Sequence, residues 1–217
     1  MIQVLLVDER QLMRAGLKRL IEEEGDITVT AEAGSGDEAV RLAQKYQIRV
    51  VVLDTCIGNP GVLETSRLLG RVDETLSILA LGDGGCGPLP ARILELSGSG
   101  YLSKQTDGAE IRRAIRKLGT GGRYVCADVA QHMVLSGIDG DGDPVDALSA
   151  RELSVMLMLS EGHPRDEISH RLCISQKTVS TYRSRLIRKL GARNDVDLAY
   201  LALHHGLVEP RPRVQFS

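Results

Sequence analysis

Short apolar runs alternate with amphipathic stretches along the first 120 or so residues of the chain. The apolar runs are strand-sized, and the stretches between them repeat their apolar residues three and four positions apart, as amphipathic helices do. We predict strands over residues 3–7, 29–32, 50–53, 76–81 and 100–102. The predicted helices cover residues 12–21, 37–46, 62–69, 89–96 and 109–118. This alternation favours an α/β fold in which a doubly wound, flavodoxin-like parallel sheet has five strands.

The pattern changes after residue 122. A short helix is predicted over residues 128–135, and residues 138–147 then lose the apolar pattern and gain Gly, Pro and Asp, which is typical of a linker. We therefore expect a first domain over residues 1–122, a linker with a short helix over 123–147 and a second domain over 148–208. The tail, residues 209–217, is predicted to be disordered.

The second domain is predicted to be a small all-α unit with a helix-turn-helix. Ser149 and Glu152 have capping-box spacing before an apolar run, and Gly162 ends the helix that they begin. A second helix is expected over residues 166–172, and the turn over 173–175 leads to a third helix capped by Ser175. A last amphipathic helix is expected over residues 196–204, with Leu198, Leu201 and Ala202 along one stripe. This stripe fits either packing on the domain's own core or pairing of two domains.

The third helix carries the strongest sign of a nucleic-acid partner. Residues 175–193 hold six Lys or Arg residues and no acidic one. Val179, Tyr182, Leu186 and Leu190 recur at helical spacing and are expected to face the core. A single surface arginine is often only a solvated charge, but that interpretation does not explain the whole pattern. The predicted contacts to double-stranded DNA are Lys177, Thr178, Ser180, Thr181, Arg183, Ser184, Arg185 and Arg188.

Charge and composition support this division of the chain. Residues 1–147 hold 16 basic and 22 acidic side chains, a net charge of −6, whereas residues 148–217 hold 11 and 7, a net charge of +4. Such asymmetry is expected when only one domain meets nucleic acid. The four cysteines show no CxxC spacing, and no apolar run is long enough to span a membrane or follows a charged leader. These features favour a cytoplasmic protein without a membrane partner.

Acidic residues follow the predicted strands of the first domain. Asp8 and Glu9 come after the first strand, Asp54 after the third and Lys104 after the fifth. Because the carboxyl ends of parallel strands meet at one edge of the sheet, these residues are expected to converge. Carboxylates suit Mg²⁺, a lysine can pair with phosphoryl oxygens, and an aspartate can attack a phosphodonor. Alternatively, Asp8 and Glu9 simply begin the first helix.

Several motifs carry a resemblance to a known family. The segments VLLVDERQLMRAGL (4–17), VVVLDTCIGNPGVLET (50–65), PLPA (88–91) and GYLSK (100–104) resemble the response-regulator receiver domain. The motifs LSARE, EIS, ISQKTVSTYR and RKL in the second domain resemble the LuxR-type helix-turn-helix. Over almost its entire length, the chain resembles the NarL/FixJ family of two-component response regulators, in particular its GacA/UvrY-like members.

The resemblance implies a role for each matching residue. Asp54 would be the phosphoacceptor, and Lys104 would contact the phosphoryl group. Asp8, Glu9 and Asp54 would hold Mg²⁺ together with the backbone carbonyl of Cys56. Tyr101 stands at the family's aromatic switch position, although a strand-end aromatic that fills the sheet edge is an equal alternative. The resemblance also implies a sensor histidine kinase or phosphotransfer protein as partner, and a homodimer on two promoter half-sites.

The chain departs from the family pattern at three positions. Gly82 stands where the family has a Ser or Thr switch hydroxyl, Glu9 replaces an Asp, and Gly58 replaces a Pro. Together with the Gly-rich loop over residues 82–87, these changes leave two interpretations open: control by phosphorylation of Asp54, or a pseudo-receiver that acts without phosphate. A signalling adaptor that does not bind DNA is a third alternative. An enzyme is not expected, because no nucleophile with an adjacent base is found.

Overall fold

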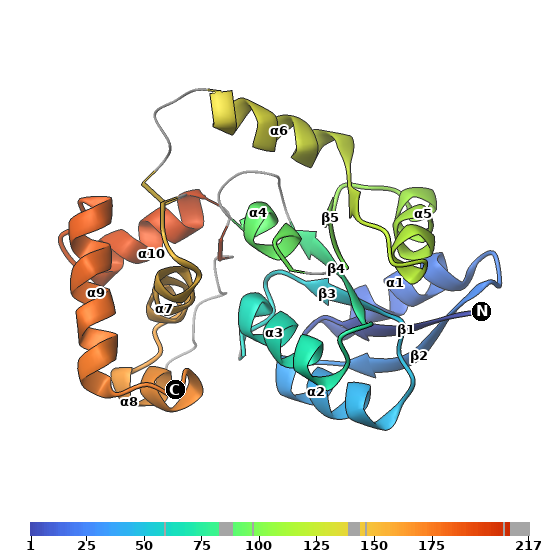
Figure 1. Ribbon diagram of the computed structural model, residues 1–217, viewed down its shortest axis with the longest axis horizontal. Coiled ribbons are helices and arrows are strands. Elements are labelled where there is room, and N and C mark those ends of the chain that lie inside the picture. Colours follow the sequence, from blue (N-terminus) through green and yellow to red (C-terminus); the bar gives the residue numbers. More distant parts are fainter. Residues whose placement is uncertain are drawn as a thin grey trace. The chain divides into compact units, whose positions relative to one another are not determined.

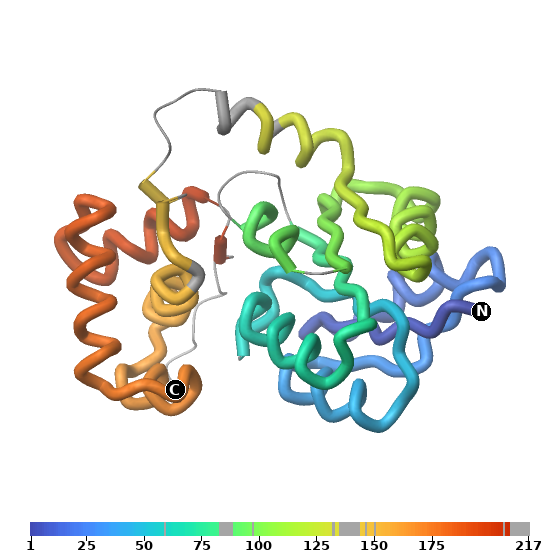
Figure 2. Tube along the Cα trace, viewed as in Figure 1, coloured from blue at the N-terminus to red at the C-terminus, as the bar shows by residue number. Residues whose placement is uncertain are grey.

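The computed structural model describes residues 1–58, 60–82, 89–96, 98–138, 144–145, 147–205 and 207–208. The chain divides into two compact units, Met1–Gly142 and Asp143–Ser217 (Figures 1 and 2). The Gly-rich loop beyond Gly82, most of the expected linker over 138–147 and the whole expected tail lie outside the described residues. Within the described part of the chain, no helix is long and apolar enough to cross a membrane.

A parallel sheet forms the centre of the first unit. Its order is β2-β1-β3-β4-β5-β6, and all neighbouring strands are parallel. The strands are β1 (Ile2–Val7), β2 (Ile27–Ala33), β3 (Val50–Asp54), β4 (Ser77–Gly82), β5 (Ser99–Ser103) and β6 (Tyr124–Val125). The doubly wound fold is confirmed, but the expected number of strands was wrong. The sixth strand is only two residues long, too short to show any periodicity in the sequence, and it is defined by its pairing with Gly100 and Tyr101.

Two rows of helices enclose the sheet (Figure 1). One row holds α1 (Gln11–Glu22) and α5 (Gly108–Gly119), which contact each other. The other row holds α2 (Gly36–Lys45), α3 (Val62–Val72) and α4 (Leu89–Leu94). In this second row, α3 contacts both α2 and α4. The residues of β3 and β4 are buried throughout. Burial on both faces explains why these strands appear in the sequence as continuous apolar runs. After β6, α6 (Ala127–Ile138) covers the span of the predicted short helix and contacts β5.

The second unit consists of α7 (Ala150–Ser160), α8 (Arg165–Arg171), α9 (Gln176–Leu190) and α10 (Asp195–His204). Its caps agree with the sequence. Ser149 and Glu152 form both hydrogen bonds of a capping box, and the Ser175 side chain accepts from the Thr178 N–H at the start of α9. Gly191, with φ of 63°, ends α9 in the left-handed region that glycine enters at little cost. The helix-turn-helix is therefore fixed at both ends of its third helix.

Packing divides the faces of α9 and α10. Val179 and Leu186 of α9 are fully buried, as predicted, while Tyr182 and Leu190 are only half-buried. On α10, which packs on α7 and α9, Leu198 and Ala202 belong to the core. The other face of α10 leaves three large apolar side chains exposed to solvent: Val196, Tyr200 and Leu203.

Candidate functional site

The acidic pocket of the first unit lies where the strand order reverses. β1 is flanked by β2 on one side and β3 on the other, so the loops that leave β1 and β3 diverge at the carboxyl edge of the sheet. Asp8 follows β1, and Asp54 is the last residue of β3. Their side chains are only 3% and 6% exposed. The topology of the sheet thus brings the carboxylates of Asp8 and Asp54 together in a place that is almost closed to solvent.

Among the described residues, three groups bind the Asp54 carboxylate. The Lys104 Nζ atom lies 2.8 Å from Oδ1, and the Cys56 N–H donates to the same oxygen at 3.2 Å. The Arg10 Nη2 atom donates to the other oxygen, Oδ2, at 3.0 Å. Lys104 is held at the sheet edge because its own N–H donates to the Gly82 carbonyl at 2.7 Å. Asp8, Asp54 and Lys104 therefore meet, as the positions of the strand ends predict.

Electrostatics at Asp54 depend on the surrounding cations. Burial raises the pKa of Asp54 above its ordinary value; the Lys104 ammonium opposes this rise, and the Asp8 carboxylate adds to it. The Lys104 ammonium therefore favours the ionised form of this buried carboxylate. Positively charged groups next to Asp54 therefore determine how readily its carboxylate ionises.

Arg10 supplies part of that positive charge, although it was not among the predicted site residues. Its Nε atom lies 3.2 Å from Asp8 Oδ1, and its Nη2 atom lies 3.3 Å from Asp8 Oδ2 as well as 3.0 Å from Asp54. The guanidinium bridges the two buried carboxylates. A basic residue directly after an acidic pair at a strand end was the signal that could have pointed to this contact.

The expected metal ligands are only partly assembled. Asp8 and Asp54 converge, but the Glu9 Oε1 atom accepts a hydrogen bond from the Gly58 N–H at 2.6 Å. Within the described residues, no three His, Cys, Asp or Glu side chains form a cluster that could hold a metal ion. The donors themselves suit Mg²⁺, since two buried carboxylates are already gathered around a cation. Asp8 and Asp54 thus fit a divalent ion in chemistry, and Arg10 holds the same oxygens.

Gly82 and Tyr101 share one space next to this pocket. Tyr101 on β5 is 3% exposed. A Cβ atom built on Gly82 would lie 1.9 Å from the Tyr101 hydroxyl oxygen, 2.7 Å from Tyr101 Cζ and 3.1 Å from Thr55 Oγ1. Ordinary nonbonded contacts between heavy atoms are about 3.5–4.0 Å. The tyrosine ring therefore fills the place that any side chain at position 82 would need.

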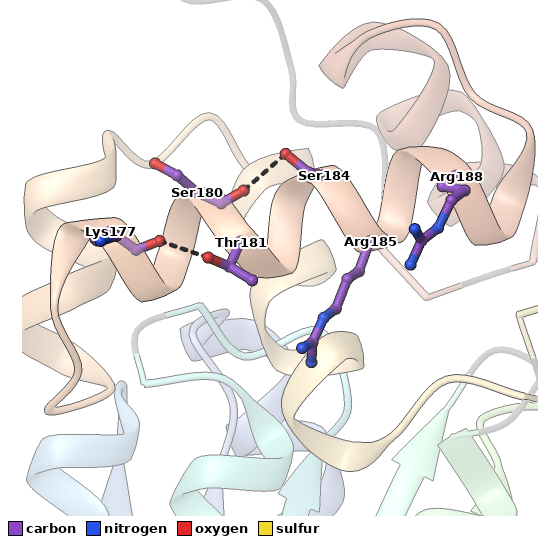
Figure 3. Close-up of a pocket in the computed structure, with 6 residues that line it drawn as sticks. All are labelled: Lys177, Ser180, Thr181, Ser184, Arg185 and Arg188. Atoms are coloured by element: carbon purple, nitrogen blue, oxygen red, sulfur yellow. Dashed lines mark hydrogen bonds between the residues drawn. The ribbon is translucent and has the colours of Figure 1, made fainter.

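Six residues along α9 line one surface of the second unit (Figure 3). The three hydroxyls on it donate to carbonyls of their own helix: Ser180 to Gln176 at 3.0 Å, Thr181 to Lys177 at 2.9 Å and Ser184 to Ser180 at 3.0 Å. Their oxygen lone pairs are left as acceptors. We call this the α9 surface, and it comprises Lys177, Ser180, Thr181, Ser184, Arg185 and Arg188.

The cations of α9 fall into two groups. In the described part of the chain, Lys177, Arg185 and Arg188 have no carboxylate oxygen within the 4.0 Å of an ion pair. Arg183, in contrast, donates from Nε to Asp195 Oδ1 of α10 at 2.6 Å. The Thr178 hydroxyl shares a 2.8 Å hydrogen bond with the Ser175 cap. Six of the eight predicted DNA contacts thus lie together, while Arg183 and Thr178 have partners elsewhere.

Two family models match the chain. The model "Response regulator receiver domain" matches residues 4–116, and the model "Bacterial regulatory proteins, luxR family" matches residues 146–202. The first therefore covers the parallel sheet with the acidic pocket, and the second covers the helices that carry the α9 surface.

Two named response regulators match the chain over nearly its whole length. The chain is 40% identical over 209 residues to the response regulator UvrY of Escherichia coli K12, covering 95% of this chain and 96% of the relative. It is 34% identical over 211 residues to the response regulator GacA of Pseudomonas aeruginosa, covering 96% and 99%. Salmonella enterica RcsB, solved bound to promoter rprA with a phosphomimetic, is 22% identical with a TM-score of 0.75, covering 92% and 96%, and shows the fold alone. The chain belongs to the NarL/FixJ family of response regulators, with a receiver domain and a LuxR-type DNA-binding domain.

Proposed function

We propose that this response regulator binds promoter DNA through the α9 surface, and that the state of Asp54 controls this binding. The receiver domain would span residues 1–122, with residues 123–147 joining it to a DNA-binding domain over 148–208. The chain would act in the cytoplasm as a transcription factor and not as an enzyme, because Asp54 would only accept and lose a phosphoryl group.

The observation that carries the proposal is the α9 surface itself. Three cations without carboxylate partners among the described residues lie beside three hydroxyls on one face of a capped helix. Cations of this kind neutralise phosphates, and hydroxyls can contact base edges in the major groove. Hydroxyls discriminate bases poorly compared with bidentate side chains, so DNA shape would contribute to specificity. Arg183 would join the phosphate contacts only after leaving Asp195.

The acidic pocket supports phosphoryl transfer as the means of control. An Asp54 oxygen would form a bond to the phosphorus of a phosphohistidine on a kinase or phosphotransfer protein, and the P–N bond would break with the histidine imidazole as the leaving group. Lys104, 2.8 Å from Asp54, would pair with the phosphoryl oxygens. Asp8, Glu9 and Asp54, with the carbonyl of Cys56, would hold Mg²⁺, which would supply positive charge for the phosphoryl oxygens.

The exposed face of α10 supports a homodimer on DNA. Val196, Tyr200 and Leu203 are 75%, 68% and 40% exposed. Apolar side chains that gather on one face of a helix favour burial against a partner. A second copy of the chain, related by a two-fold axis, would read the second half-site of an operator.

The salt dependence of DNA binding tests the proposal. We expect Arg188→Gln to lower the slope of log K against log salt by about one, because one phosphate contact is lost. Arg193→Gln is the control: it removes the same charge from a side chain that pairs with Asp197 and lies outside the α9 surface, so its slope should equal that of the wild type. Equal slopes for Arg188→Gln and the wild type, measured by fluorescence anisotropy, would argue against the α9 surface as the DNA contact.

A second function is favoured by two observations in the receiver domain. Arg10 already bridges Asp8 and Asp54, and Tyr101 fills the space at Gly82. Both fit a pseudo-receiver that regulates DNA binding without phosphate, through a partner protein. The absence of detectable DNA binding at low salt would instead favour a signalling adaptor that does not bind DNA.

A further inference from the structure

Arg10 binds the same carboxylate oxygens that a divalent ion would need. Its guanidinium contacts both oxygens of Asp8 and the Oδ2 atom of Asp54, at 3.0–3.3 Å. We propose that Arg10 is a built-in cation that competes with a divalent metal ion for this pocket, and so sets the metal concentration at which the receiver can be loaded. This inference rests on the proposed function of Asp54.

The charge balance of the pocket gives the first reason. Asp8 and Asp54 contribute two negative charges, and Lys104 and Arg10 contribute two positive ones, through contacts of 2.8–3.3 Å. With Arg10 in place, these four groups are neutral, so a divalent ion gains little from entering. When Arg10 swings away, the pair of carboxylates again needs a cation.

The geometry of Arg10 gives the second reason. Asp8 and Asp54 are almost fully buried, whereas the Arg10 side chain is 45% exposed. Arg10 reaches the pocket from the solvent side, at the position before the first residue of α1, and its side chain makes no capping hydrogen bond. It can therefore leave for water without breaking the helix, and it remains fully charged at any physiological pH.

The backbone of the same loop stays anchored when the side chain moves. The Arg10 N–H donates to Asp8 Oδ1 at 2.7 Å, and the Arg14 Nη1 atom donates to the Asp8 carbonyl at 2.6 Å. Neither bond involves the Arg10 guanidinium. A substitution at position 10 should therefore change the charge in the pocket while leaving the loop in place.

Mn²⁺ binding to the full-length protein tests the competition directly. The affinities of the wild type, Arg10→Gln and Arg10→Lys are measured from the electron paramagnetic resonance signal of free Mn²⁺. We expect Arg10→Gln to bind Mn²⁺ about tenfold more tightly, the change expected when one partly exposed, charge-assisted contact no longer competes. Arg10→Lys keeps the positive charge but loses the planar guanidinium that bridges two carboxylates. Its affinity for Mn²⁺ should therefore lie between those of the wild type and Arg10→Gln.

Arg19→Gln is the matched control, because Arg19 lies on the exposed surface of the same helix. Its affinity for Mn²⁺ should equal that of the wild type. Equal or weaker binding by Arg10→Gln overturns the inference, and so does an equal gain in Arg19→Gln, which would indicate only a long-range charge effect. Absence of Mn²⁺ binding in every variant also overturns it, since there would be no site for which to compete.

Metal-free stability provides an independent measurement. In EDTA, Arg10→Gln should melt below the wild type, because Asp8 and Asp54 lose a shared partner, and Mg²⁺ should raise its Tm more than that of the wild type. An equal response of both proteins to Mg²⁺ contradicts the inference. Failure of the proposed function gives a different result: Arg10→Gln then binds Mn²⁺ more tightly, yet intact-mass spectrometry finds no phosphoryl adduct on it.

Discussion

Replacing Gly82 with alanine places one methyl group where Tyr101 already lies. The new Cβ atom would be 1.9 Å from the Tyr101 hydroxyl oxygen and 2.7 Å from Cζ, far inside the ordinary contact distance of about 3.5 Å. The backbone of β4 cannot move away easily. Its neighbours pair with it on both sides: Leu81 accepts from the Thr55 N–H at 2.9 Å, and Gly82 accepts from the Lys104 N–H at 2.7 Å.

The tyrosine must therefore give way, and two limits bound the cost. Local repacking around one extra methyl group in a filled core costs about 1–3 kcal/mol. Expelling the ring to solvent exposes roughly 150 Å², which at about 25 cal/mol per Å² is about 4 kcal/mol. We expect Gly82→Ala to lower the free energy of unfolding of the receiver domain by about 1–4 kcal/mol.

Urea unfolding of the full-length chain, followed by circular dichroism, measures this cost. Hydrogen exchange of peptides from β4 and β5 assigns the loss to the receiver domain. Gly70→Ala is the control for the backbone effect of losing a glycine, because Gly70 lies within α3 and nothing within 4 Å would meet its Cβ atom. That variant should gain up to about 1 kcal/mol.

A double-mutant cycle isolates the contact. Tyr101→Leu removes the atoms that clash, so Gly82→Ala should cost about 1–2 kcal/mol less in the Tyr101→Leu background than in the wild type. Additive effects would contradict a clash between the two side chains, and so would a Gly82→Ala variant as stable as the wild type. Either result would mean that the tyrosine does not occupy the space beside Gly82.

Two further predictions concern the DNA-binding domain. Burial raises the pKa of Glu152, but hydrogen bonds from Lys189 and Ser149 outweigh this effect, so the pKa lies below its ordinary value. The ionised Glu152 therefore stabilises the domain above about pH 4.3, and this stabilisation is lost as the pH falls further. Glu152→Gln should flatten the acid side of the Tm profile of this domain, and an unchanged profile would contradict the pairing. Tyr200→Ser should weaken dimer formation on a two-half-site DNA without lowering Tm, because Tyr200 is 68% exposed; unchanged stoichiometry in sedimentation equilibrium would count against the α10 face.

Topology explains why the sequence could predict the acidic pocket. Apolar runs buried on both faces marked the strands, and parallel strands bring their carboxyl ends to one edge, so Asp8, Asp54 and Lys104 had to be neighbours. The caps of the second domain were predictable because Ser149, Gly162 and Ser175 act on residues a few positions away.

Other features depend on contacts between distant residues. The position of the Arg10 guanidinium depends on Asp54, 44 residues away. Arg183 donates a hydrogen bond to Asp195 of the next helix and so lies outside the α9 surface. The glycine at position 82 indicated a missing hydroxyl, but only the packing shows that Tyr101 fills the vacated space. A long side chain can adopt many rotamers. Neighbours that are distant in the sequence select one of them, and the local periodicity of the sequence does not reveal these neighbours.

One paired measurement decides whether phosphorylation of Asp54 controls DNA binding. The wild type and Asp54→Ala are incubated with Mg²⁺ and acetyl phosphate, and each sample is divided between intact-mass spectrometry and DNA titration. We expect a single phosphoryl adduct on the wild type alone, together with tighter DNA binding by that sample. No adduct, or an adduct that leaves the DNA affinity unchanged, would contradict it.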